Sequence, residues 1–268
     1  MASKSYRRKP IAKRKSNATS KWIFFLISFV LCLFVAVGIY KFRDGFLYYL
    51  GFKTDKNVET LSKEERKLAD IRIYEVLHKH DDKAIGFDVS EYQSEIDWEQ
   101  TYHIDESFEL SFVFIRSTAG KNKVDKRIKE NWKASKEREL IRGAYHYYRP
   151  NENSIEQAEN FIKTVKLQKG DLPPVLDIEK LPKSQSIDSL KVGLRRWLKK
   201  VEKYYKVKPI IYSGESYYTD FLKEEFSEYP LWIANYNFWR NDLESDWQFW
   251  QFTEKAQIEG IEGKVDEN

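Results

Sequence analysis

Two acidic residues, Asp177 and Glu179, stand two positions apart in the run Leu172-Pro-Pro-Val-Leu-Asp-Ile-Glu179. On a β-strand, this spacing points both carboxyl groups to one face with Cα atoms ~6.5 Å apart. Like charges held together in a partly buried place raise the pKa of one group and leave the other ionised. Such a pair can supply the proton donor and the negative partner that hydrolysis of a glycosidic bond requires. An isolated Asp-x-Glu is more often a solvated strand end, but two acids are poorly placed on so apolar a strand.

The elements that must position this pair alternate between short β-like runs and helical runs. Strands are predicted at 85–89, 112–116, 142–147, 174–178, 209–212, 231–234 and 249–252. Helices are predicted at 126–139, 154–165 and 187–205, the second opened by Ser154 and Gln157 as a capping box. This alternation predicts a modified (β/α)8-like barrel with some helices short or missing. An open doubly wound sheet is the alternative, although no Gly-rich phosphate loop follows any strand.

Two further acids stand at predicted strand ends, where a parallel barrel gathers its reactive groups. Asp88 closes the first strand, and Asp266 follows the apolar residues Ile261 and Val265. Each has an ordinary alternative, since Asp88 could cap a helix near 97–100 and Asp266 could belong to a solvated tail. His146, within an apolar strand, is more often a hydrogen-bonded core residue than a catalyst.

The start of the chain has a different composition from the rest. Residues 1–21 hold eight Lys or Arg and no acid, and residues 22–40 form an uncharged run rich in Phe, Leu, Ile and Val. Such a run is about long enough to cross the ~30 Å core of a bilayer as a helix. We therefore expect one N-terminal transmembrane helix with a basic cytoplasmic tail and the remaining chain on the extracytoplasmic side. A cleaved signal peptide is the alternative, since Ala36-Val37-Gly38 offers small residues at cleavage-site spacing; in either case the body is exported.

Between the apolar run and the first predicted strand lies a charged stretch, 41–83, in which Ser62 and Glu65 have the spacing of a capping box. We interpret it as a juxtamembrane helix and linker, a spacer that lifts the domain at 84–268 off the bilayer. His78 and His80 have no carboxylate company, so a metal site there is the less favoured interpretation.

Composition excludes several classes of function. Eight of the 46 basic residues lie in the first 21, so the remaining 38 face all 42 acidic residues. A mildly acidic body is not typical of a nucleic-acid binder. Cys32, the single cysteine, lies in the predicted membrane segment, which excludes an intrachain disulfide, a Cys-based zinc site and a catalytic thiol in the exported domain.

Six sequence blocks together resemble the glycoside hydrolase family 25 lysozymes, and they occur in the order of that family across residues 84–268. They are Gly86-Phe-Asp-Val-Ser-Glu-Tyr-Gln93 with Ile96-Asp-Trp98, Phe112-Val-Phe-Ile-Arg-Ser-Thr-Ala-Gly120, Gly143-Ala-Tyr-His-Tyr147, Leu172-Pro-Pro-Val-Leu-Asp-Ile-Glu179, Leu231-Trp-Ile-Ala234, and Trp250-Gln-Phe-Thr253 with Val265-Asp266.

The resemblance implies a modified β/α barrel that cleaves the β-1,4 bond between N-acetylmuramic acid and N-acetylglucosamine in peptidoglycan, without metal or cofactor. Glu179 corresponds to the family's general acid and Asp177 to its partner carboxylate, acting as nucleophile or as stabiliser of a substrate-assisted intermediate. The two further active-site acids correspond to Asp88 and Asp266. Gln93, Tyr147 and Trp98 are then expected to line or support the sugar groove, with packing under the first loop as an equal alternative for Trp98.

One departure from the family stands out. The family usually has Thr-Glu-Gly after the second strand, whereas this chain has Thr118-Ala119-Gly120, so any auxiliary role of that Glu is absent. Two other functions therefore stay open: hydrolysis of another N-acetylhexosamine polymer such as chitin, and non-catalytic binding to the cell wall.

Overall fold

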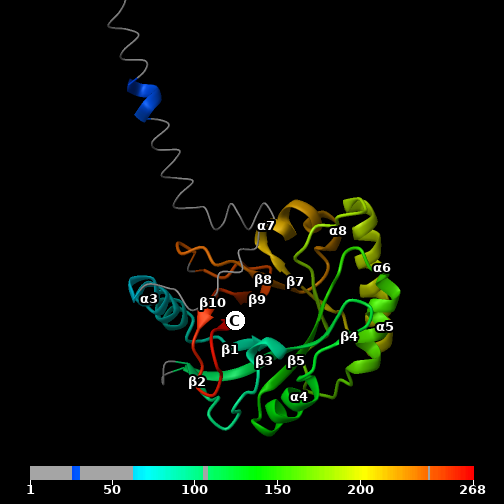
Figure 1. Ribbon diagram of the computed structural model, residues 1–268, viewed down its shortest axis with the longest axis horizontal. Helices are drawn as coiled ribbons and strands as arrows, with labels where there is room; N and C mark the ends of the chain where they lie inside the picture. Colours follow the sequence, from blue (N-terminus) through cyan, green and yellow to red (C-terminus); the bar gives the residue numbers. More distant parts are fainter. Residues whose placement is uncertain (1–25, 31–62, 105–107, 241) are drawn as a thin grey trace, which may run out of the picture. The chain divides into compact units, whose positions relative to one another are not determined.

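A computed structural model describes residues 26–30, 63–104, 108–240 and 242–268 (Figure 1). The chain divides into two compact units, Met1–Asp55 and Lys56–Asn268. Of the first unit only residues 26–30 are described, and they are helical. Within the described residues no helix has the length and apolar character needed to cross a bilayer. The predicted basic tail at 1–21 and most of the predicted membrane helix at 22–40 lie outside the described residues.

Seven parallel strands form the wall of a barrel in the second unit, and each of the seven predicted strands is confirmed. In spatial order they are β1 (Ile85–Val89), β3 (Phe108–Ala119), β5 (Ile141–Tyr147), β6 (Val175–Asp177), β7 (Ile210–Gly214), β8 (Leu231–Ala234) and β9 (Trp247–Gln251). Their spatial order follows their order along the chain, as the βα alternation predicts. Short strands β2 (His103–Ile104) and β4 (Lys123–Val124) pair with β3.

The ring closes in an unusual way for a β/α barrel. Strand β10 (Thr253–Ala256) continues directly from β9 after Phe252, and β11 (Val265–Glu267) runs antiparallel between β10 and β1. The Phe252 amide donates to the Glu267 carbonyl at 3.1 Å, so pairing resumes at the bend. Figure 1 shows the resulting circle of strands, with the C-terminal end of the chain beside β1.

Helices cover the outside of the ring unevenly. α4 (Ile128–Glu137), α5 (Ser154–Thr164) and α6 (Ile187–Tyr205) follow β3, β5 and β6, and they lie together outside the ring in Figure 1. After β7 there are only short turns, α7 (Glu215–Tyr217), η3 (Tyr218–Leu222) and α8 (Lys223–Phe226). Between β8 and β9 the described residues form no helix. The expected modified barrel with shortened or missing helices is confirmed.

The predicted capping box of α5 is wrong. The N-cap is Asn153, whose side-chain oxygen accepts from the amides of Ile155 and Glu156. Gln157 is fully buried, and its side chain bonds the main chain of Arg149 instead of turning back to Ser154. Both Asn and Ser are good caps, so sequence alone could not decide between neighbours.

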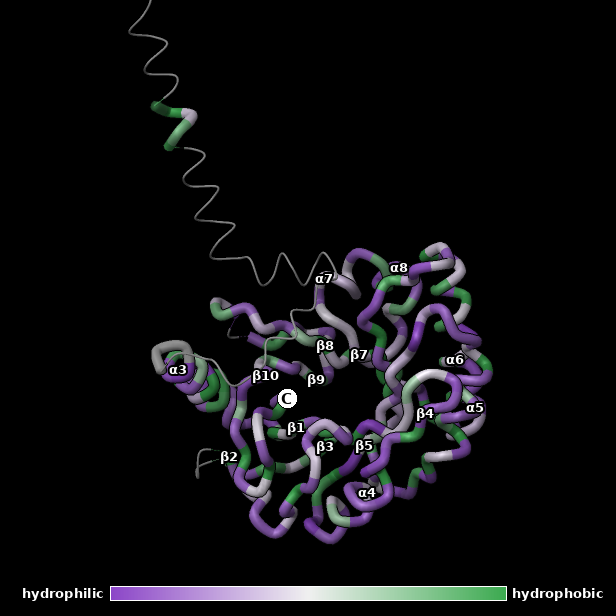
Figure 2. Tube along the Cα trace, in the orientation of Figure 1, coloured by the Kyte–Doolittle hydropathy of each residue, from purple (hydrophilic) through white to green (hydrophobic). Residues whose placement is uncertain are grey.

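Large aromatic rings pack against one another inside the ring of strands. Phe114 stacks on Trp232 with ring centroids 4.2 Å apart, and Phe112 and Phe249 pack edge-on beside them. Gly86 and Gly143 face these rings, since a Cβ atom at either would lie about 2.5 Å from Phe112 or Phe114. Figure 2 shows hydrophobic and hydrophilic positions interleaved around the ring, as two-sided strands require.

A helix precedes the barrel, as predicted for the 41–83 stretch, but it is not a free spacer. α3 (Lys63–Lys79) buries Ile73, Val76 and Leu77 in the outer core. The Arg72 guanidinium donates to the carbonyls of Phe252 and Asn237, the latter at 2.9 Å. α3 therefore packs as part of the unit that holds the barrel. The predicted capping pair, Ser62 with the Glu65 side chain, lies outside what the structure describes.

Candidate active site

Strand direction brings the four predicted acids to one end of the barrel, the end where the parallel strands finish, which we call the mouth. Asp88 lies near the end of β1 and is the register partner of Asp266 on β11. Asp177 is the last residue of β6, and Glu179 follows two positions later. Asp88 and Asp177 are buried, whereas Glu179 and Asp266 are half-buried. Asp88 and Asp266, which are far apart in the sequence, lie side by side because β11 pairs with β1.

The pKa values of two tyrosines at the mouth, Tyr145 and Tyr212, are affected by these carboxylates. Burial raises the pKa of the Tyr145 phenol, and the charges of Asp88, Asp177 and Asp266 raise it further. Burial likewise raises the pKa of Tyr212, with added contributions from Glu179, Asp177 and Asp266. Since Coulomb effects of this kind fall off with distance, the four acids lie around the same pair of rings.

Asp88 is held by two side-chain amides. Its Oδ2 atom accepts from Gln251 Nε2 at 2.6 Å and from Asn268 Nδ2 at 3.1 Å, and no cation lies within ion-pair distance among the described residues. Burial raises its pKa to about 7, the two amide hydrogen bonds oppose that rise, and the charge of Glu179 adds to it. Asp88 therefore keeps its proton at pH values where an ordinary aspartic acid has lost it.

A second layer of polar side chains orients the two amides that hold Asp88. Asn268 accepts through Oδ1 from Trp232 Nε1 at 2.6 Å. Gln251 accepts through Oε1 from the Tyr212 hydroxyl at 2.6 Å and from the Tyr236 hydroxyl. With their oxygens occupied, both amides present N–H groups to the carboxylate.

Sequence reasoning did not single out these supporting residues. Tyr145, Tyr212 and Gln251 are polar residues on the strands β5, β7 and β9, and Asn268 follows β11. The alternation of polar and apolar residues was available in the sequence, for example at Gln251 between Trp250 and Phe252. Which of these residues face inward is decided only once the ring is assembled.

Of the three predicted groove residues, Tyr147 lies at the mouth. It ends β5, it is the register partner of Asp177, and Lys180 Nζ lies 5.5 Å from its ring centroid. Gln93 is half-buried, and its Oε1 accepts from the Ser90 amide at 2.8 Å, closing the cap of the short helix Glu91–Gln93. Its placement is therefore tied to the loop that follows β1.

Trp98 is not brought to the acids. It is buried and packs against Phe87, with centroids 6.1 Å apart, on the face of β1 opposite to Asp88. This is the packing role that the sequence left as an alternative. Asp97, and not Asp88, bonds the amide of Glu99 in this loop.

His146 has the core environment that its apolar strand predicts. Its ring is fully buried, Nδ1 lies 2.7 Å from Thr118 Oγ1, and Nε2 lies 3.1 Å from Gln157 Oε1. The ring stacks on Trp197, and burial lowers its pKa to about 3. It faces away from the acids and stays neutral.

The mouth is bounded near β3 by a compact group of charges. Ala119, which ends β3, is buried between its register partners Tyr147 and Lys123. Close by, Arg116 Nε donates to Asp125 Oδ2 at 2.9 Å. The same guanidinium lies 4.5 Å from the exposed ring of Tyr92.

The arrangement fits acid–base work on a polar substrate. Several carboxyl groups converge, at least one with a raised pKa, under an aromatic rim. Within the residues that the structure describes, no group of three or more His, Cys, Asp or Glu side chains could hold a metal ion.

Comparison with known proteins gives consistent matches over the barrel. The sequence model described as "Glycosyl hydrolases family 25" matches residues 87–261. A protein of Escherichia coli (strain K12) named "Uncharacterized protein YegX" is 43% identical over 185 residues, covering 68% of each chain. Lysozyme M1 of Streptomyces globisporus is 31% identical over 198 residues, covering 68% of this chain and 66% of that protein.

Solved structures match the same part of the chain. A family 25 glycosyl hydrolase from Bacillus anthracis superposes with a TM-score of 0.61 at 29% identity, covering 69% of this chain and 87% of that one. A bacterial lysozyme from Streptomyces coelicolor superposes with a TM-score of 0.60 at 26% identity, covering 69% and 90%.

Proposed function

Because the chain belongs to glycosyl hydrolase family 25 and is a glycoside hydrolase, we propose that it is a peptidoglycan muramidase that uses Glu179 as its general acid. The bond cleaved is the β-1,4 linkage between N-acetylmuramic acid and N-acetylglucosamine. The observation that carries the proposal is the convergence of Asp88, Asp177, Glu179 and Asp266 on one mouth around Tyr145 and Tyr212.

In this mechanism Glu179, half-buried at the mouth, gives its proton to the glycosidic oxygen as the bond breaks. Asp177, buried at the end of β6, offsets the positive charge that develops on the sugar. It does so either by bonding to the anomeric carbon or by orienting the substrate's 2-acetamido group, which then closes on that carbon. Water completes the reaction, and Glu179 takes back a proton.

Asp88 has a supporting role in this proposal. Burial, and to a smaller extent the charge of Glu179, raise its pKa to about 7. Asp88 therefore retains a proton near neutral pH beside the proposed general acid. Asp266, beside Asp88 in the register, adds negative potential on the same side of the mouth.

The decisive experiment replaces Glu179 by Gln and measures release of reducing sugar from purified peptidoglycan. We expect the rate to fall by at least about 100-fold, the usual scale for losing a general acid. Glu262→Gln, at an exposed position between β10 and β11, is the matched control and should keep full activity. Undiminished activity in Glu179→Gln would disprove the assignment.

Product analysis separates the muramidase from the other two functions left open. After borohydride reduction, a muramidase leaves reduced muramic acid at the new chain ends, whereas a glucosaminidase leaves reduced glucosamine. Cleavage of chitin with no cleavage of peptidoglycan would favour the other N-acetylhexosamine polymers. Peptidoglycan binding without turnover by the unaltered protein would favour a non-catalytic module.

We also propose that residues 22–40 anchor the enzyme in a membrane, with the basic tail in the cytoplasm and the barrel on the extracytoplasmic side. Support comes from nineteen uncharged residues preceded by eight basic ones. The full-length chain should sediment with membranes, resist extraction at alkaline pH, and be cut by protease added from outside. A released form beginning shortly after Gly38 would favour the signal peptide instead.

A further inference from the structure

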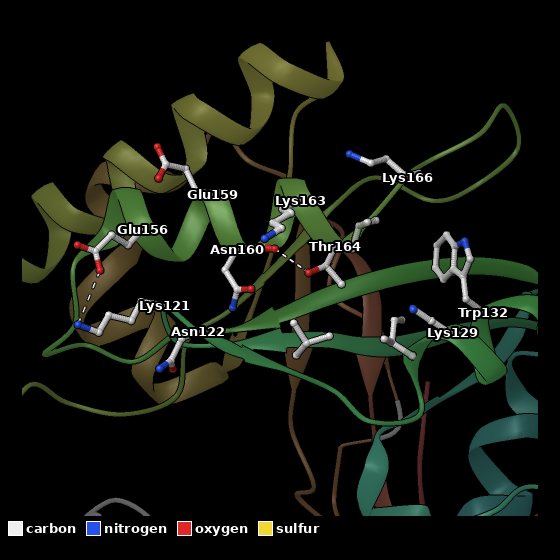
Figure 3. A pocket seen from close by; sticks show the side chains of 13 residues that line it. Lys121, Asn122, Lys129, Trp132, Glu156, Glu159, Asn160, Lys163, Thr164 and Lys166 are labelled. Carbon is white, nitrogen blue, oxygen red and sulfur yellow. Dashed lines mark hydrogen bonds and ion pairs between the residues drawn. The ribbon is translucent and has the colours of Figure 1, made fainter.

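A hollow on the barrel unit lies outside the ring and is not lined by any of the four acids. It measures about 790 Å³ and runs between α4 and α5 (Figure 3). Val124 of β4, Ile128 of α4 and Val165 after α5 give it an apolar floor. One end begins at Lys121, two residues after Ala119 ends β3, so the hollow starts close to the mouth of the barrel.

The rim of this hollow carries a surplus of positive charge. Four lysines line it against two glutamates. Both glutamates are already paired, since Glu156 lies 3.7 Å from Lys121 and Glu159 lies 2.8 Å from Lys200 of α6. Lys129 and Lys163 are exposed, and in the described part of the chain no acid lies within ion-pair distance of either. The hollow therefore presents unneutralised ammonium groups above an apolar surface.

An aromatic ring is fixed at the wall of the same hollow. Trp132 is half-buried, and the Arg142 guanidinium lies 4.2 Å from its ring centroid. That guanidinium is itself held, since Arg142 Nε donates to Asp171 Oδ1 at 2.8 Å and Nη1 donates to the Trp132 carbonyl at 2.6 Å. A ring held by buried partners loses little conformational freedom when a ligand packs on it. Figure 3 shows Trp132 and Lys129 side by side at one end and Lys163 farther along.

We propose that this hollow is a second binding site, for a carboxylate-bearing glycan. A sugar ring packs on Trp132, and carboxylates along the chain contact Lys129 and Lys163. Its identification with peptidoglycan, whose peptide stems carry carboxylates, rests on the proposed function. Two features argue for this occupant, namely charge complementarity and the position of one end of the hollow near the mouth. A glycan strand held in the hollow keeps its neighbouring glycosidic bonds at high local concentration near the acids of the mouth.

The test is co-sedimentation with purified peptidoglycan, in a Glu179→Gln background to suppress cleavage. Lys129→Glu with Lys163→Glu is compared with Lys199→Glu plus Lys223→Glu, an equal charge change at exposed lysines of α6 and α8 outside the hollow. We expect the first pair to weaken binding about tenfold at low salt and the control pair to change it by less than about twofold. Equal weakening by both pairs overturns the proposal, because it would report only the net charge of the protein.

A second arm identifies the chemistry of the ligand. Peptidoglycan whose carboxyl groups have been converted to amides should bind the unaltered hollow about as weakly as native peptidoglycan binds the Lys129→Glu/Lys163→Glu variant. Unchanged binding of the amidated polymer overturns the carboxylate assignment. Loss of binding only towards a phosphate-rich wall polymer, with peptidoglycan unaffected, overturns it as well.

Cleavage of a short soluble glycan fragment keeps this proposal separate from the proposed function. With Glu179 intact, the Lys129→Glu/Lys163→Glu variant should cleave the fragment at the unaltered rate and cleave insoluble peptidoglycan more slowly. If the unaltered protein cleaves neither substrate, the proposed function is refuted, and the binding comparison still decides whether the second site exists. If cleavage of both substrates is slowed equally, the lysines contribute to catalysis at the mouth, and the proposal of a second site is overturned.

Discussion

Two buried aspartates near the mouth of the barrel differ in what surrounds them. Asp125, just after β4, accepts from Arg116 Nε at 2.9 Å and from the amides of Glu91 and Arg127 at 3.0 Å each. Asp88, on β1, accepts from two side-chain amides and has no ion-pair partner in the described part of the chain, while burial and the like charge of Glu179 raise its pKa. One carboxylate has a cation beside it, and the other has an acid.

This difference separates a carboxylate with a structural environment from the one proposed to serve the reaction. A buried charge is tolerated when an opposite charge and hydrogen bonds compensate its lost hydration. Where only neutral donors are provided, the group takes up a proton more readily, as the pKa of Asp88 near 7 reflects. Asp125 therefore connects loops through its hydrogen bonds, whereas Asp88 lies at the mouth with its raised pKa.

The largest expected effect tests the structural side of the comparison. Asp125→Ala should lower the free energy of unfolding by about 3–5 kcal/mol, because the buried Arg116 guanidinium loses the nearer of its two carboxylates and the amides of Glu91 and Arg127 lose their acceptor. Urea unfolding measures it. Asp81→Ala, at an exposed position before β1, is the control and should change stability by less than about 0.5 kcal/mol. Equal losses in the two variants would mean that Asp125 contributes no special stabilisation.

The next effect concerns the reactive side and depends on pH. The pKa of Asp88 is raised in the folded protein from 3.8 to about 7, so the folded state binds more protons than the unfolded state between these values. The resulting stabilisation is complete below pH 4 and is lost as pH rises to 7, by up to roughly 4 kcal/mol.

The measurement is urea unfolding of wild type and Asp88→Asn at several pH values between 4 and 8. The stability advantage of wild type over the variant should shrink steadily across that window. A difference that stays constant with pH would show that Asp88 titrates normally and would remove the contrast with Asp125.

Activity should respond to the same substitution by a smaller free energy. Asp88→Asn removes the acid coupled to Glu179, and we expect kcat/KM on peptidoglycan to fall by about 100-fold, or about 2.7 kcal/mol. Thermal unfolding near pH 7 should show a variant at least as stable as wild type, because an amide carries no buried charge. Full activity in a folded variant would assign Asp88 a purely structural role, like that of Asp125.

The smallest expected effect concerns the residues that hold Gln251, one of the two amides bonded to Asp88. Tyr236→Phe removes one of two hydroxyl donors to Gln251, and Tyr212 continues to hold that amide. We expect a loss of about 1 kcal/mol, seen as roughly a fivefold fall in kcat/KM. Tyr74→Phe, on the exposed face of α3, is the matched control. A loss as large as that of Asp88→Asn would mean that Tyr236 itself contacts substrate.

Much of the barrel was predictable because its signals are local. Each of the seven strands is a short apolar run between turn-forming residues, and α4, α5 and α6 show amphipathic periodicity. Asp177 and Glu179 were also found locally, by their spacing. The cap of α5 was not predictable locally, since Asn153 and Ser154 are both suitable caps. Gln157 bonds His146 in the core, so its side chain does not form a capping box with Ser154.

The role of α3 was likewise hidden. A charged, weakly patterned helix resembles a spacer when read alone, and its three buried apolar residues matter only because the outside of the ring offers a surface there. Trp98 shows the same limit, since nothing in its block says which side of β1 it will cover.

By itself the sequence determined the positions of the parallel strands, the pair Asp177 and Glu179, and the blocks that mark the family, because these depend on neighbours along the chain. Only the tertiary structure decided that Asp266 lies beside Asp88, that Gln251 and Asn268 hold that carboxylate, and that Trp98 turns away. The physical reason is closure of the ring. Antiparallel pairing of β11 with β1 joins the ends of the domain, and it sets which carboxyl groups share one low-dielectric space.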